Sequence, residues 1–368
     1  MQQIRYIVGA GFSAPLGLPT RASFLERAKD MLFRHPDRYG HHHSLVKEFD
    51  QIAKVGIYCK TDPLDIEEAL SIIEMENFAK ARRTKKPFLD LISDTVEYYS
   101  RALEKVEGPV EEEWTVNPFG PHTRINLYGV FVTSLLGLRF YERAHESENQ
   151  SEPETEYIAE HLPARNSYAV LSTNWDLVLE RFADAIRRHY RGSENAGFLR
   201  PVIDEAADDE DEDSAAGRVP LVKLHGSVDG DIQLFPTWAR STHKKAAQIW
   251  EHGLNLLSQA NHIRILGHAM AESDIHLRTL IKAAVLAAPH LKTIDVICRD
   301  ADGSVRRRYR SFFPFRGFRF VDADILSYLK FLNDWYVQHA RDRNALSTAL
   351  FDDAHEAFMQ RSVEAPRR

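Results

Sequence analysis

The chain has 368 residues, of which 43% are hydrophobic and 27% are charged, so it is long enough for one large domain with an insertion or for two linked domains. Its formal net charge of -7 argues against a dedicated nucleic-acid-binding protein, because such proteins need a basic surface to contact phosphates. Two cysteines, Cys59 and Cys298, cannot form a disulfide framework or a four-cysteine zinc module.

Two absences in the sequence bear on location. No apolar run reaches the length of about 18 residues that is needed to cross a bilayer. The first residues, MQQIRYIVGAG, lack the basic start and the small-residue cleavage site of a secretory signal. We therefore expect a cytoplasmic protein that does not enter a membrane.

Six short apolar runs that stop at glycine or polar residues predict buried parallel strands. They cover residues 4–8, 168–173, 220–224, 262–266, 293–298 and 317–321. Amphipathic helical patterns at 175–190, 243–260 and 273–288 separate the later strands. This alternation predicts an α/β fold with a doubly wound, six-stranded, parallel Rossmann-like sheet.

The segment between the first two predicted strands is too long for one crossover helix and reads as almost wholly helical. It opens with a possible capping box at Ser23 and Glu26. We expect a large helical insertion at 23–166 that forms a lid or wall over the sheet edge. The Rossmann-like domain would comprise 1–22 and 167–333, followed by a C-terminal helical extension and tail at 334–368. The acidic run 204–217 predicts a solvated loop, and the tail from residue 354 is expected to fray.

The first predicted strand runs into GAGFS at 9–13. Gly9 and Gly11 would let the backbone turn tightly and approach a pyrophosphate, and the following amides could bind its oxygens, although an ordinary glycine turn fits as well. No acidic residue closes a second strand about 20 residues after GAGFS, as one does in dehydrogenases, and GKS and GKT are absent. The dehydrogenase and P-loop interpretations are therefore not supported.

Polar residues also follow three later strands. Asn174 and Asp176 in LSTNWD would face the same crevice as GAGFS, but both types also cap helices. His225 in VKLHGS is placed to act as a general base, or is structural. Gly267 ends a strand in a turn that suits the second half of a dinucleotide, and Ser273 or Asp274 suits a helix cap.

These motifs in this order resemble the sirtuin-like domains of the NAD-consuming kind found in bacterial anti-phage defence systems. The motifs are GAGFSAPLGLP at 9–19, STNWD at 172–176, KLHGS at 223–227 and LGHAMAESD at 266–274. The resemblance covers roughly 4–24 and 167–325, and no motif matches the helical insert. It implies that Asn174, Asp176 and His225 are catalytic. It further implies that NAD⁺ is held by Gly9, Ala10, Gly11, Ser13, Thr173, Gly226, Gly267 and His268.

Two departures separate this chain from the protein-deacylating branch of the family. That branch carries a four-cysteine zinc module and an aspartate, phenylalanine, arginine run, whereas this chain has two cysteines and reads Thr20, Arg21, Ala22. We therefore expect an NAD⁺ glycohydrolase that releases nicotinamide and ADP-ribose, without zinc or another metal. NAD-dependent deacylation, ADP-ribosyl transfer and a non-catalytic NAD or ADP-ribose sensor remain alternatives.

The resemblance also implies a role and partners. It suggests an NAD⁺-depleting effector of anti-phage defence that is restrained by self-assembly into a homo-oligomer or by a partner ATPase of the DNA-translocase type. No sequence-specific nucleic-acid binding is expected. His41, His42 and His43 are interpreted as a surface loop, because adjacent histidines point apart and lack a spaced partner set. The basic cluster 306–310 is interpreted as a solvated hairpin or an interface patch.

Overall fold

A seven-stranded sheet forms the centre of the computed structural model, which describes residues 1–52, 66, 68–69, 72, 75, 86–101, 103, 123–145, 154–162, 166–201, 218–230, 244–271, 274–339 and 348–364. All neighbouring strands of this sheet run parallel. In spatial order they are β5 (Gly197–Leu199), β6 (Arg218–Lys223), β4 (Asn166–Ser172), β1 (Gln2–Val8), β7 (His262–Leu266), β8 (Thr293–Ile297) and β9 (Phe318–Val321).

The six predicted strands are confirmed, but the predicted strand count is wrong. The seventh strand, β5, has only three residues and pairs with β6 at the sheet edge, so it leaves no apolar run in the sequence. With β5 set aside, the strands lie in the chain order 3-2-1-4-5-6, which is the order of doubly wound dinucleotide-binding sheets. The order reverses at β1, which lies between β4 and β7.

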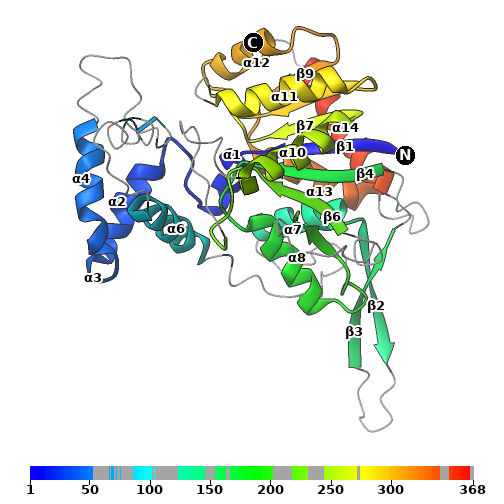
Figure 1. The fold of residues 1–368 in the computed structure, drawn as a ribbon. Helices are drawn as coiled ribbons and strands as arrows, with labels where there is room; N and C mark the ends of the chain where they lie inside the picture. The colour runs from blue at the N-terminus through cyan, green and yellow to red at the C-terminus, as the bar shows by residue number, and fades with distance from the viewer. Residues whose placement is uncertain are drawn as a thin grey trace.

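Helices cover both faces of the sheet (Figure 1). One face packs against α10 (Lys244–Ser258), α11 (Ile275–Ala287) and α12 (Ser304–Phe312), and the other against α7 (Thr123–Leu135), α8 (Val178–His189), α13 (Ile325–His339) and α14 (Thr348–Glu364). Successive side chains of β1 point to opposite faces, so Tyr6 lies in one core and Ile7 in the other. The predicted helices at 175–190, 243–260 and 273–288 are thereby confirmed as α8, α10 and α11.

The prediction of an almost wholly helical segment at 23–166 is wrong in part. Its described residues include α2 (Phe24–Arg34), α3 (Pro36–Tyr39), α4 (His43–Ile52), α6 (Lys86–Ser100) and α7, but also an antiparallel hairpin of β2 (Leu138–His145) and β3 (Glu154–His161). The apolar run LLGLRFY reads on as a helix, yet Gly137 takes φ 64° just after α7 and turns the chain into β2. Helix α2 does begin after Ser23, whose hydroxyl contacts Thr20 and caps no helix amide.

Two expectations for the later chain are also wrong. The tail does not fray from residue 354, because α14 continues to Glu364 and buries Phe351, Ala354 and Met359. Its Asp352 pairs with Arg264 of β7 at 2.7 Å, which ties the helix to the sheet. The basic cluster 306–310 lies in α12 and is not a hairpin, while its interpretation as an interface patch stays a prediction.

The acidic run 204–217 lies outside the described residues. No helix in the described part of the chain is long and apolar enough to span a membrane.

Candidate functional site

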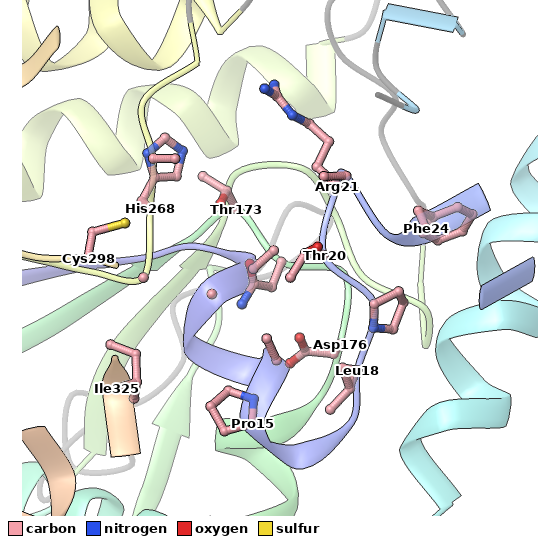
Figure 2. Close-up of a pocket in the computed structure, with 18 of the residues that line it drawn as sticks. Pro15, Leu18, Thr20, Arg21, Phe24, Thr173, Asp176, His268, Cys298 and Ile325 are labelled. Carbon is pink, nitrogen blue, oxygen red and sulfur yellow. The ribbon is translucent and has the colours of Figure 1, made fainter. Parts of the chain in front are cut away.

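A cavity of about 830 Å³ opens where the parallel strands end (Figure 2). The segments after β1, β4, β6, β7 and β8 form its walls together with the start of α13. In doubly wound sheets, ligands bind outside the carboxyl ends of the strands, near the point where the strand order reverses. The cavity also lies within the size range of pockets for small molecules and cofactors, roughly 300–1,000 Å³.

Most of the residues expected to form the site line this cavity. Eight do so, namely Ala10, Gly11, Thr173, Asn174, Asp176, His225, Gly267 and His268. Gly9, Ser13 and Gly226 do not line it. The placement of Ser13 does not support its expected contact with phosphates, since this side chain is buried behind the wall with 1% of its surface exposed.

The Asn174 side chain is held in place by the turn after β1. Its Nδ2 donates to the carbonyl of Gly9 at 3.0 Å and to the hydroxyl of Ser13 at 3.2 Å. Neither bond caps α8, so the helix-cap alternative fails for this residue. Its Oδ1 is buried and accepts no hydrogen bond from the described residues, which costs about 1–3 kcal/mol unless a ligand or water donates to it.

Asp176 contacts the start of α8 through its side chain, although the N-cap residue of this helix is Leu177. Its Oδ1 accepts from the amide of Val178 at 3.1 Å, at the start of α8. Burial raises the pKa of the Asp176 carboxyl, against the opposing effects of the Lys223 ammonium and a hydrogen bond from Ser13. The Ser13 hydroxyl, which accepts from Nδ2 of Asn174, therefore also lies close enough to the Asp176 carboxyl to lower its pKa.

His225 follows β6 and has 4% of its surface exposed. Its ring lies 6.4 Å from the ring of Trp250 on α10, with 30° between the planes. The imidazole is thus buried at the cavity wall beside the Trp250 ring. A histidine in this position can exchange a proton with a group bound in the cavity.

The glycines after β1 and β7 are needed for contact between two turns. The amide of Gly11 donates to the carbonyl of Gly267 at 2.8 Å, and a Cβ on Gly11 would lie 2.6 Å from that oxygen. Gly267 has φ +63°, and a Cβ there would lie 2.2 Å from the amide nitrogen of Phe12. The amides of Gly11 and Phe12 already bond to protein carbonyls, so the expectation that they bind a pyrophosphate is not supported.

His268 and Asp274 form a buried pair on the β7 side of the cavity. Nδ1 of His268 accepts from the amide of Met270 at 3.0 Å, so the ring proton is on Nε2, which faces Oδ2 of Asp274 at 3.5 Å. Burial raises the pKa of Asp274, but the hydrogen bond from His268 and the electrostatic effect of nearby His225 and His268 outweigh it and hold the pKa at about 2. Asp274 also caps α11, as expected, and Ser273 lies outside the described residues.

Several lining residues carry no recognisable signal in the sequence. Arg27 of α2, Ile66, Val96 of α6 and Arg124 of α7 come from the segment between β1 and β4, so this segment provides one wall. Only the three-dimensional packing reveals them, because they belong to no strand end.

Cys298 also lines the cavity (Figure 2). Burial raises the pKa of its thiol to about 12, so it is no thiolate nucleophile at neutral pH.

Comparison with known proteins adds no family assignment, because neither a scan of protein-family models nor a search of curated proteins gives a match.

Proposed function

We propose that this protein is an NAD⁺ glycohydrolase of the sirtuin-like kind, which cleaves NAD⁺ to nicotinamide and ADP-ribose. One observation carries the proposal: the buried Oδ1 of Asn174 has no donor among the described residues, at a cavity that His225 also lines. A ribose hydroxyl or a water molecule bound to that oxygen would supply the missing hydrogen bond. The cavity's position at the reversal of the strand order suits a dinucleotide.

The proposed fold follows from the same strand order. Residues 1–22 and 167–333 form a Rossmann-like NAD-binding domain, the segment 23–166 is an insertion that closes one side of the cavity, and 334–368 is a C-terminal extension. The contacts of Arg27 and Arg124 with the cavity favour this role for the insertion.

Charge along the cavity wall supports binding of a diphosphate. Its lining includes Arg21, Arg27, Arg124 and Arg299, and guanidinium groups bind phosphate oxygens through paired N–H donors. Since the amides of Gly11 and Phe12 are used within the protein, these arginines are the better candidates for the pyrophosphate.

In the proposed reaction, the bond between nicotinamide and C1′ of the ribose breaks, and its electron pair stays on the nicotinamide ring nitrogen. Positive charge builds on the ribose, as in sugar hydrolysis. The oxygen of a water molecule, positioned by Oδ1 of Asn174, attacks C1′ while His225 accepts its proton. Asp176 is a positioning residue, because its hydrogen bond with the amide of Val178 fixes the turn between β4 and α8 that carries Asn174.

Such an enzyme would drain a cell of NAD⁺, so its activity requires restraint. We propose a cytoplasmic, NAD⁺-depleting effector of anti-phage defence, controlled by homo-oligomerisation or by an ATPase partner of the DNA-translocase type. Size-exclusion chromatography combined with the activity assay tests this. A monomer that stays active without a partner contradicts it.

Product identification tests the function itself. The purified full chain is incubated with NAD⁺, with and without a candidate partner, and the products are separated by chromatography. We expect equal amounts of nicotinamide and ADP-ribose from the wild type and from Asn195→Ala, an exposed control, and neither from Asn174→Ala. ADP-ribose attached to an acceptor would instead indicate a transferase, and binding of NAD⁺ without nicotinamide release would indicate a sensor.

A further inference from the structure

Two histidines and a carboxylate converge outside the lining of the cavity, on the segment that carries α2, α4 and α6 to one side of the sheet (Figure 1). Nε2 of His42 lies 2.8 Å from Oδ2 of Asp94, and Nε2 of His41 lies 3.7 Å from the same oxygen. The two imidazole rings are 3.9 Å apart between centroids. One possible ligand atom from each of the three residues lies within 4.8 Å of the other two.

This arrangement corrects the interpretation of His41, His42 and His43 as a surface loop whose side chains point apart. His41 and His42 end a short 3-10 turn, Gly40–His42, in which neighbouring side chains are about 120° apart instead of on opposite sides as in a strand. Both rings can therefore reach Asp94 on α6. His42 is buried, with 1% of its side chain exposed, whereas the His41 side chain is 60% exposed.

We propose that His41, His42 and Asp94 bind a divalent transition-metal ion. Two imidazoles and one carboxylate are ligands that suit Zn²⁺, Co²⁺ and Ni²⁺, whereas Mg²⁺ and Ca²⁺ prefer sites made only of oxygen. Around a tetrahedral zinc ion with bonds of about 2.0–2.1 Å, neighbouring ligand atoms lie about 3.3 Å apart. The two observed separations, 2.8 and 3.7 Å, lie on either side of that value, and all three ligand atoms lie within 4.8 Å of one another.

This proposed metal site is separate from the candidate functional site, since none of its three residues lines the cavity. It connects the turn before α4 to α6, across 52 positions of the sequence. A metal ion there would link two parts of the segment between β1 and β4. Because it would bind the folded state, its stabilising effect would grow as the free metal concentration rises above the dissociation constant. Three protein ligands leave a fourth position for water on the exposed side of His41.

Zinc titration of the full chain tests the proposal, with any polyhistidine tag removed and bound metal stripped by a chelator. Isothermal titration calorimetry should show a Zn²⁺ site in the wild type and in His43→Ala, the matched control, since His43 is exposed and is not one of the three ligands. His41→Ala and Asp94→Asn should weaken this site by at least about tenfold. Equal zinc affinity in the wild type and His41→Ala overturns the proposal, as does the absence of zinc binding in the wild type.

A second measurement guards against misfolded variants. His41 is exposed, so its replacement should leave the far-ultraviolet circular dichroism spectrum unchanged. Zinc should raise the thermal unfolding midpoint of the wild type and His43→Ala, but not of folded His41→Ala. An equal rise in His41→Ala would place the bound zinc elsewhere and refute the assignment.

Discussion

Replacing Gly11 with alanine should force apart the turns after β1 and β7, because these turns touch through their backbones. The added Cβ would lie 2.6 Å from the carbonyl oxygen of Gly267 and 3.0 Å from its Cα. Neither atom belongs to a side chain that can rotate away. The two turns must move, and the cavity wall that they share must move with them.

The cost follows from these distances. Restoring ordinary contact requires a separation of about 0.8 Å, which stretches the Gly11 to Gly267 hydrogen bond from 2.8 Å to beyond bonding distance. Losing that bond costs about 1 kcal/mol, and overpacking adds about 1–3 kcal/mol. We therefore expect Gly11→Ala to lower the free energy of unfolding by about 2–4 kcal/mol.

Urea unfolding followed by circular dichroism measures this change. Gly40→Ala is the matched control, because Gly40 has φ −59° and an added Cβ meets nothing within 4 Å. The double variant Gly11→Ala/Gly267→Ala should lose less than the sum of the two single losses, since both substitutions break the same contact. A Gly11→Ala protein as stable as Gly40→Ala, or strictly additive losses, would refute the reasoning.

The remaining predictions concern α14. Burial lowers the pKa of His355 to about 4 from a usual 6.5. Between pH 6.5 and 4, His355 is therefore protonated in the unfolded chain but neutral in the folded chain. The contribution of neutral His355 to the free energy of unfolding is complete above pH 6.5 and falls by on the order of 3 kcal/mol as the pH drops to 4. Urea unfolding at both pH values should show a smaller loss of stability for His355→Gln than for the wild type. An equal loss would contradict this prediction. Asp352→Asn removes the charge that pairs with buried Arg264 and should lower the free energy of unfolding by on the order of 3 kcal/mol. The control Asp353→Asn changes an exposed residue and should lower it by less than about 0.5 kcal/mol. Equal urea midpoints for the two variants would disprove this prediction.

The sequence predicts the sheet well because buried parallel strands leave short apolar runs. β5 escapes because three residues at an edge make no such run. The hairpin of β2 and β3 reads as helix in the sequence because the apolar pattern continues through Gly137, where only the backbone angle reveals the turn. Local pattern is therefore informative about buried strands and weak at edges and turns.

The residues of the candidate site also fall into those that the sequence predicts and those that it does not. Thr173, Asn174 and His225 could be predicted to lie together, because parallel strands end at one edge of a sheet. Arg27 and Arg124 could not, since they reach the cavity through packing between distant segments. The convergence of His41 and His42 on Asp94 was likewise hidden, because 52 positions separate the partners in the chain.

The most direct test of the proposed function is the rate of nicotinamide release from NAD⁺ by His225→Ala, under the condition in which the wild type turns over. His252→Ala serves as the control, because His252 is an exposed histidine of α10 that does not line the cavity. If His225 accepts the proton of the attacking water, kcat should fall by about 10²–10⁴-fold in folded His225→Ala and stay at the wild-type value in His252→Ala. Equal rates in the wild type and His225→Ala would contradict the account.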